Sequence, residues 1–189
     1  MCPKKNMQNH LNQSASKNLL TAAIMINALK ALDQLLTFET TLIVGGGGAM
    51  ILAHHYPLAT TDIDAIPRGM DLSVIGSLLQ TVAHDLSLPH DWLNPYFGTF
   101  THTLPADYGD RLITVFNGKY LKAQALGGEE MLIMKCFASR QKDVGHAKAL
   151  IKNGVDTKRV EKHIETLLKK RIPGAQNALD FLDDLKDQL

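Results

Sequence analysis

The sequence predicts an α+β fold: a small mixed β-sheet with helices packed on it, followed by a C-terminal helical subdomain. Short apolar, β-branched runs alternate with segments of helical periodicity up to about residue 128, and the remainder is helical throughout. The 189 residues are enough for one well-cored domain, or for a core with a small helical appendage. We therefore expect a flexible leader at 1–16, an α/β core at 17–128 and a helical subdomain at 129–189 packed on that core.

The expected strands are short runs of β-branched and other apolar residues bounded by glycine, proline or polar residues. They lie at 40–44, 62–66, 99–104, 111–116 and 119–126. Asn117-Gly118 separates the last two, and this dipeptide between strand-like runs is the strongest short hairpin signal. The expected helices repeat apolar residues three and four positions apart. They lie at 17–36, 49–55, 71–86, 129–140, 143–153, 156–171 and 174–188, with Ser16 and Asp156 as candidate N-caps.

Two neighbouring segments carry the candidate chemistry of the chain. Residues 42–49 form a buried strand that runs into a turn of four glycines, and residues 60–64 begin the next apolar strand. Because side chains on a strand alternate between two faces, Asp62 and Asp64 should point to one face and Ile63 into the core. A glycine turn that admits phosphate, beside paired acids that can hold Mg²⁺, is what phosphoryl or nucleotidyl transfer requires.

Each of these features also has a purely structural interpretation. The glycines could form only a tight strand-to-helix turn, and the acidic pair could lie at a solvated strand end. Two better-known phosphate-binding loops do not match. The run Gly47-Gly48-Ala49-Met50 lacks the Gly-Lys-Ser/Thr of the nucleoside triphosphatase loop, and neither Gly45 nor Gly46 starts the glycine spacing of the dinucleotide fingerprint.

Charge is unevenly distributed, although the net charge is only +1. Residues 1–118 carry 6 basic and 9 acidic side chains, residues 119–172 carry 13 and 6, and residues 173–189 carry 1 and 4. The basic middle segment would suit a polyphosphate or an RNA backbone, and a solvated helical face is the alternative. No apolar run has the length of a membrane span, and Cys2 and Cys136 do not suggest a disulfide framework, so we expect a cytoplasmic protein without membrane contact.

Other catalytic patterns are missing from the sequence. It contains no His-Glu-x-x-His that would indicate a zinc enzyme and no Gly-x-Ser-x-Gly that would indicate a serine nucleophile. Cys136 lies in an apolar helical stretch and is expected to be buried rather than reactive. Two aromatic residues of the irregular segment after residue 86, Trp92 and Tyr96, either stack a nucleobase or anchor the loop.

Three motifs in a fixed order resemble those of the nucleotidyltransferase-fold superfamily. They are Gly46-Gly47-Gly48-Ala49, Thr60-Thr61-Asp62-Ile63-Asp64, and Lys135 followed by Arg140-Gln141-Lys142-Asp143. The likeness spans about residues 19–170 and is closest to bacterial AbiEii-type nucleotidyltransferases, which include toxins of toxin–antitoxin pairs. It implies an enzyme that uses Mg²⁺ or Mn²⁺ to transfer a nucleoside monophosphate from a nucleoside triphosphate to an acceptor. The implied acceptor is an RNA 3′ end, such as that of tRNA, or a protein hydroxyl, and an antitoxin protein is an implied partner.

The resemblance also implies roles for individual residues. Asp62 and Asp64 would bind the metal ion, Lys135 would contact phosphate, and Asp143 would complete the site or hold Lys135. The nucleotide would be bound by Gly45, Gly46, Gly47 and Thr61 together with Lys135. From the residues alone, Lys135 could equally extend from an apolar helix to solvent, and Arg140 and Asp143 could form an ordinary pair on a helix surface.

Three departures from the family pattern leave a rival function open. No arginine precedes Thr60, the expected strand at 112–116 lacks a third carboxylate, and His146 stands where relatives often have a second acid. The missing carboxylate would come from Asp107, Asp110 or Asp143 if the fold brings one of them to the pair. If none reaches it, a catalytically impaired protein that binds nucleotide or a protein partner is favoured.

Overall fold

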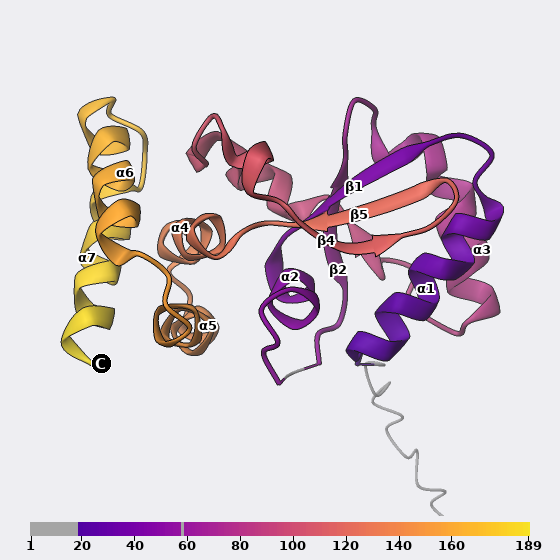
Figure 1. Ribbon diagram of the computed structural model, residues 1–189, viewed down its shortest axis with the longest axis horizontal. Helices are drawn as coiled ribbons and strands as arrows, with labels where there is room; N and C mark the ends of the chain where they lie inside the picture. Colours follow the sequence, from indigo (N-terminus) through magenta and orange to yellow (C-terminus); the bar gives the residue numbers. More distant parts are fainter. Residues whose placement is uncertain (1–18, 58) are drawn as a thin grey trace, which may run out of the picture.

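The computed structural model describes residues 19–57 and 59–189, and a five-stranded mixed sheet forms its centre (Figure 1). The strands are β1 (Thr40–Val44), β2 (Ile63–Pro67), β3 (Leu93–Asn94), β4 (Ile113–Asn117) and β5 (Leu121–Ala125). Their order across the sheet is β3-β2-β1-β5-β4. Strand β1 pairs parallel with β5 and antiparallel with β2, whereas β4 and β5 form the hairpin predicted around Asn117-Gly118. The mixed sheet is thus confirmed.

Helices surround this sheet and continue beyond it (Figure 1). They are α1 (Ala22–Leu35), α2 (Gly46–Leu52), α3 (Gly76–Asp85), α4 (Gly128–Ala138), α5 (Gln141–Lys152), α6 (Thr157–Lys169) and α7 (Ala175–Asp187). Three 3₁₀ helices lie between strands: η1 (Leu72–Ile75), η2 (Tyr96–Thr103) and η3 (Tyr108–Arg111). The α+β class with a C-terminal helical part is confirmed. None of the helices in the described ranges is long and apolar enough to cross a membrane.

Helix α4 is the centre of packing in the second half of the chain. Every residue from Glu130 to Cys136 is buried, as expected for a helix that is covered on all sides. It contacts α2 and η2 toward the sheet, and α5, α6 and α7 on its other sides (Figure 1). Cys136 is fully buried as predicted. The helical part therefore packs on the α/β part chiefly through α4, with added contacts from His146 of α5 to Tyr56 and from His163 of α6 to the Thr103 carbonyl.

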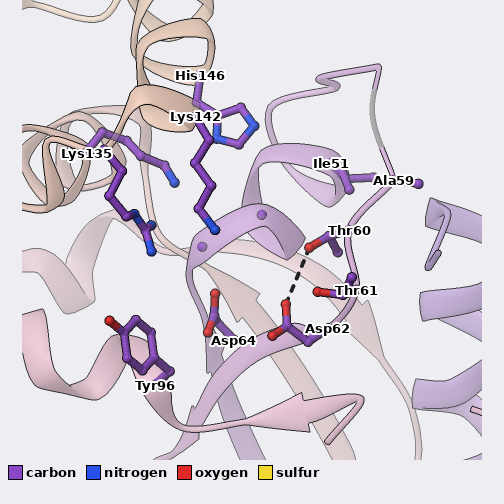
Figure 2. A pocket seen from close by; sticks show the side chains of 13 residues that line it. Ile51, Ala59, Thr60, Thr61, Asp62, Asp64, Tyr96, Lys135, Lys142 and His146 are labelled. Atoms are coloured by element: carbon purple, nitrogen blue, oxygen red, sulfur yellow. Dashed lines mark hydrogen bonds between the residues drawn. The ribbon is translucent and has the colours of Figure 1, made fainter. Parts of the chain in front are cut away.

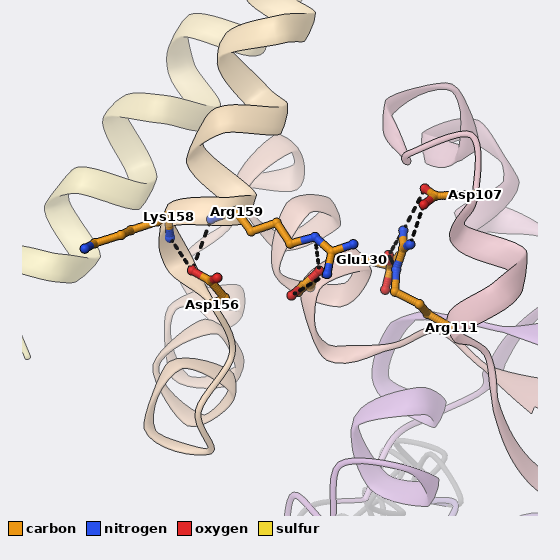
Figure 3. Close-up of polar contacts among 7 residues, drawn as sticks. Asp107, Arg111, Glu130, Asp156, Lys158 and Arg159 are labelled. Atoms are coloured by element: carbon orange, nitrogen blue, oxygen red, sulfur yellow. Dashed lines mark hydrogen bonds and ion pairs between the residues drawn. The ribbon is translucent and has the colours of Figure 1, made fainter.

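A salt bridge network ties the end of η3 to α4 (Figure 3). The Arg111 guanidinium donates to both carboxylate oxygens of Asp107, at 2.7 and 3.0 Å, and to Glu130 at 2.7 Å. Glu130 is only 1% exposed, so Arg111 supplies the hydrogen bonds that water cannot. Nearby, Asp156 accepts from the backbone amides of Lys158 and Arg159 and caps α6, which confirms the predicted N-cap.

Asp33 joins α1 to the connection between β4 and β5. Its carboxylate accepts from the backbone amides of Lys119 at 3.0 Å, Tyr120 at 2.7 Å and Leu121 at 2.7 Å. These are charge-assisted hydrogen bonds, which are stronger than bonds between neutral groups. This contact could not be predicted from local patterns, because the donors lie more than 80 positions away along the chain.

Several predicted boundaries need correction. The strand expected at 99–104 is wrong, since residues 99–103 belong to η2 and the neighbouring strand β3 is only Leu93–Asn94. The helix expected at 49–55 begins earlier, at Gly46, so three of the four glycines belong to α2. Helix α1 begins at Ala22 behind the N-cap Thr21, and the predicted cap Ser16, Cys2 and the leader at 1–16 lie outside the described residues. The helix expected at 71–86 is split into η1 and α3.

Candidate active site

The two aspartates lie where β2 begins and point to the same side of the strand (Figure 2). Ile63 between them is fully buried, as the strand period predicts. Asp62 accepts a hydrogen bond from Thr60 Oγ1 at 3.4 Å and one from Asn94 Nδ2 at 2.9 Å. Asn94 belongs to β3, which pairs with β2 at this point. The short third strand therefore fixes the orientation of one carboxylate of the pair.

The glycines lie against the acidic pair because side chains would not fit there. The Gly45 amide donates to the Asp64 carbonyl at 2.8 Å, which holds the turn on β2. Gly46 has a φ of +55°, and a Cβ at this position would lie 2.7 Å from Asp64 Cγ. A Cβ at Gly47 would lie 2.8 Å from Thr60 Oγ1, and one at Gly45 would meet the ring of Phe97. The backbone of α2 thus approaches the carboxylates closely.

Three cationic side chains from α4 and α5 face the acidic pair across a cavity of about 490 Å³. Gly46, Gly47, Thr61, Asp62 and Asp64 line it on one side. Lys135, Arg140 and Lys142 line it on the other, together with His146 and Tyr96. Gly45 and Asp143 are not part of this lining and lie behind it. The fold thus brings most of the residues named by the resemblance to one cavity.

Two of the three cations are already paired within the protein. Asp143 is fully buried and accepts from Lys135 Nζ at 2.7 Å and from Arg140 Nε at 2.7 Å. Burial alone would raise the pKa of Asp143, but the hydrogen bonds from Arg140 and Lys135 outweigh it and keep that pKa below its usual value. Lys142 has no such partner among the described residues, and Figure 2 shows its ammonium group directed toward Asp64.

The electrostatics of the acidic pair favour a cation. Burial, and then the neighbouring charge of Asp62, raise the pKa of Asp64 to about 6. On the opposite wall, burial and the charge of Lys135 lower the pKa of His146 to about 4, so this histidine is neutral at physiological pH. Its Nδ1 is buried without a hydrogen-bond partner in the part of the chain that the structure describes.

Asp62 and Asp64 fit a divalent cation of the Mg²⁺ type. They supply carboxylate oxygens, which such hard cations prefer. Burial and the charge of Asp62 raise the pKa of Asp64 although the charges of Lys135, Arg140 and Lys142 oppose the rise, so a cation at the pair would favour its ionised form. The third carboxylate that the sequence analysis sought does not join them. Among residues 19–57 and 59–189, no group of three acidic, histidine or cysteine side chains could hold a metal ion. Asp107 pairs with Arg111 and Asp143 with Lys135 instead.

Asn94 and Lys142 belong to this site as well, although they were not predicted from the sequence. Asn94 has no motif of its own and matters only because β3 lies beside β2. Lys142 lies within the Arg140–Asp143 motif, and this position could have indicated that it belongs to the site. Of the two loop aromatics, Trp92 is fully buried and donates from its indole to the Leu79 carbonyl, whereas Tyr96 is 57% exposed and lines the cavity.

Comparison with known proteins places the chain in a family. Residues 18–183 match the model of a family described as "Nucleotidyltransferase of unknown function (DUF6036)". No curated protein and no solved structure matches the chain. The match covers most of the sequence and includes the glycine turn, the acidic pair and the cationic wall. The chain therefore belongs to this family of nucleotidyltransferases.

Proposed function

We propose that this protein transfers a nucleoside monophosphate from a nucleoside triphosphate to an acceptor, with Mg²⁺ or Mn²⁺ as cofactor and release of pyrophosphate. The observation that carries the proposal is the pairing of Asp62 and Asp64 with a cationic wall across one cavity. The family description supports the reaction type. The composition of the cavity suits a substrate that carries several negative charges and a divalent cation.

The side chains of the cavity have separable roles in this reaction. Asp62 and Asp64 would hold the metal ion, which when bound supplies charge that stabilises the phosphates and the departing pyrophosphate. Gly46 and Gly47 leave room for phosphate beside the carboxylates, because a Cβ at either position would collide with Asp64 or Thr60. Arg140 and Lys142 add positive charge on the opposite wall.

The acceptor hydroxyl must lose a proton during transfer, and the structure limits what can take it. Asp143 is held by Lys135 and Arg140 and is therefore committed to an ion pair. His146 lines the cavity as a neutral imidazole whose Nδ1 has no hydrogen-bond partner among the described residues, and we assign it the role of base. A His146→Gln variant should then lower the transfer rate more than the affinity for nucleotide.

A labelling experiment tests the reaction type. The protein is incubated with Mg²⁺, tRNA or bulk protein as acceptor, and each nucleoside triphosphate labelled either at the α- or at the γ-phosphate. Transfer of α-label with release of pyrophosphate is expected. Transfer of γ-label would instead show a kinase. The Asp62→Asn, Asp64→Asn double variant is the control, since it keeps the size of both side chains and removes their charge.

The absence of a third carboxylate from the described site favours one rival. Two carboxylates hold a metal ion less firmly than three, so the protein could bind nucleotide, or a partner protein through it, without transferring any group. This rival is favoured over the enzyme if the wild type binds nucleotide only with Mg²⁺, if the double variant does not bind it, and if neither acceptor receives label.

RNA is the acceptor that the charge distribution favours. Exposed basic side chains outside the cavity lining lie along α5 and α6 and would suit a phosphate backbone. They include Lys152, Lys158, Lys162 and Lys169. Labelling of tRNA that falls steeply with rising salt is expected, whereas labelling of protein that is independent of salt would contradict an RNA acceptor.

The kinship to AbiEii-type nucleotidyltransferases, and with it a role as the toxin of a toxin–antitoxin pair, is part of this proposal. It rests on the order of the three motifs in the sequence. Induced expression of the wild type should slow growth of a bacterial host, and Asp64→Ala should not. Equal growth of the two strains at equal protein levels would contradict a toxin role that depends on transfer.

A further inference from the structure

We propose that the nucleotide lies in the cavity in one direction, with its base against Tyr96, its reacting phosphate at Asp64 and its terminal phosphates at Lys142. This inference rests on the proposed function, because it assumes that the cavity receives a nucleoside triphosphate. In Figure 2, Asp64 lies between the Lys142 ammonium group on one side and the Tyr96 ring on the other. The two ends of the cavity therefore differ in chemistry.

Lys142 marks the phosphate end because it is the cation free to leave its present surroundings. Of the three cations that line the cavity, Lys135 and Arg140 are both bound to the buried Asp143. Removing either from Asp143 would leave the buried carboxylate with only one of its two cationic partners, which is unfavourable. Lys142 is exposed and has no ion pair within the described chain. A terminal phosphate gains an ammonium partner there without breaking an existing pair.

The neighbours of Lys142 also fix the position of its backbone. Asp143 follows it directly and is fully buried, and the Asp143 amide donates to the Arg140 carbonyl at 2.8 Å to begin α5. The backbone of Lys142 is thus anchored while its side chain remains in the cavity. Lys135 and Arg140 act here as positioning residues, since they hold α5 in place through Asp143.

Tyr96 marks the nucleoside end because it is an exposed aromatic residue beside other apolar side chains. Its side chain is 57% exposed, and its ring lies 6.3 Å from that of Phe100 in an edge-to-face arrangement. A smaller hollow adjoins the main cavity, and the two share Gly46, Asp64, Tyr96, Lys135 and Arg140. The side chains that line only the smaller hollow are apolar: Phe97, Phe100, Met134 and Ala138. Any of the nucleobases can stack on such a ring.

Asn94 holds the two parts of the site at a fixed spacing. Its Nδ2 donates to Asp62 at 2.9 Å, and its Oδ1 accepts from the Tyr96 amide at 3.0 Å. One side chain thus connects the acidic pair to the backbone that carries the aromatic ring. A base on Tyr96 is thereby placed next to a phosphate at the acidic pair, and the phosphate chain continues toward α5.

The orientation is tested by measuring the affinity of three ligands in the presence of Mg²⁺: ATP, AMP and inorganic tripolyphosphate. Weak ligands are measured by displacement of a fluorescent ATP analogue. We expect Lys142→Gln to weaken ATP and tripolyphosphate about tenfold and to leave AMP unchanged, as for loss of one charged contact. We expect Tyr96→Leu to weaken ATP and AMP about tenfold and to leave tripolyphosphate unchanged.

Two further variants control for indirect effects. Tyr96→Phe keeps the ring and should retain the affinity for ATP and AMP. Lys30→Gln removes an exposed charge from α1, outside the cavity, and should change no affinity. A loss of AMP binding in Lys142→Gln equal to the loss of ATP, or a loss of tripolyphosphate binding in Tyr96→Leu, would overturn the orientation. If the wild type binds ATP and the two substitutions affect the three ligands as expected, but no group is transferred, the orientation stands and the proposed reaction fails. Absence of any binding would overturn both.

Discussion

At the scale of single residues, the ionised form of the Asp64 carboxyl is unfavourable in the folded protein without a bound cation. Burial and the charge of Asp62 raise its pKa to about 6 in the folded protein, against 3.8 in an unfolded chain. Protonation is therefore easier in the folded state, and stability falls as the pH rises from about 4 to about 6. A cation at the pair would remove this penalty.

We predict that Asp64→Asn stabilises the metal-free protein at pH 8. One pKa unit corresponds to about 1.4 kcal/mol, so the gain in the free energy of unfolding should be about 1–3 kcal/mol after allowance for partial exposure. The gain should vanish below about pH 4, where the wild-type carboxyl is neutral in both states. Urea unfolding in the presence of EDTA measures it. The exposed Asp91→Asn is the control, and a loss of stability in Asp64→Asn at pH 8 would contradict the prediction.

Gly46 provides a second test at this scale. Gly46→Ala would impose a left-handed φ on alanine and place a methyl group against the Asp64 carboxylate. We expect a loss of about 1–3 kcal/mol in stability and at least a tenfold loss of nucleotide affinity with Mg²⁺. Gly69→Ala is a matched control, because its φ is +80° but no atom lies within 4 Å of the added Cβ. Equal nucleotide binding by both variants would show that the close approach at Gly46 has no functional role.

At the scale of secondary structure elements, η2 shows why part of the fold could not be predicted from the sequence. Residues 99–104 have the β-branched and aromatic composition of a strand. Three threonine hydroxyls nevertheless donate to the backbone three residues earlier: Thr99 to Tyr96, Thr101 to Gly98 and Thr103 to Phe100. These local bonds offer the backbone an alternative to a strand ladder. Periodicity alone does not register such competition.

The acidic pair and its glycine turn were predictable because their chemistry follows from spacing within one segment. Asp62, Ile63 and Asp64 alternate as a strand requires, and the structure keeps that alternation. The roles of Asn94 and Lys142 were not predictable, because they depend on which strand lies beside β2 and on which cation Asp143 leaves unpaired. Tertiary placement, rather than residue type, decides both.

Asp33 gives a prediction at the scale of elements, because it connects α1 to the β4–β5 hairpin. Burial opposes its ionisation, but the three backbone hydrogen bonds outweigh burial and keep its pKa below the usual value. Asp33→Ala should therefore reduce the free energy of unfolding by about 1–2 kcal/mol at pH 7. The difference from wild type should shrink as the pH falls below about 4, because the unfolded chain then binds a proton more readily than the folded protein does. Gln34→Ala, on the same helix, is the control in thermal unfolding, and equal midpoints for both variants would contradict the role.

At the scale of the whole molecule, α4 lies between the α/β part and the helices α5, α6 and α7 (Figure 1). The division into a core at 17–128 and a helical subdomain at 129–189 stays a prediction, and Cys136 can test it. Burial raises the pKa of this thiol to about 12, so it should react only after opening of the structure.

We predict that Cys136 becomes reactive only when the entire chain unfolds, since α4 contributes to both parts of the core. In a Cys2→Ser background, the rate of thiol labelling is measured at increasing urea concentration. The free energy of opening should equal that of global unfolding measured by circular dichroism. A smaller free energy with weaker urea dependence would show that the helical subdomain opens by itself.

The edges of the sheet have a consequence for how copies of the protein meet. On one side, β4 pairs with β5 through a register shift between Thr114 and Phe116, and such a bulge twists an edge strand away from a flat geometry. On the other side, β3 is only two residues long and offers little backbone for another chain to pair with. Both edges are thus poor templates for an incoming strand. The protein should resist aggregation by strand addition even at high concentration, and an assembly with a partner should use side chains rather than sheet extension.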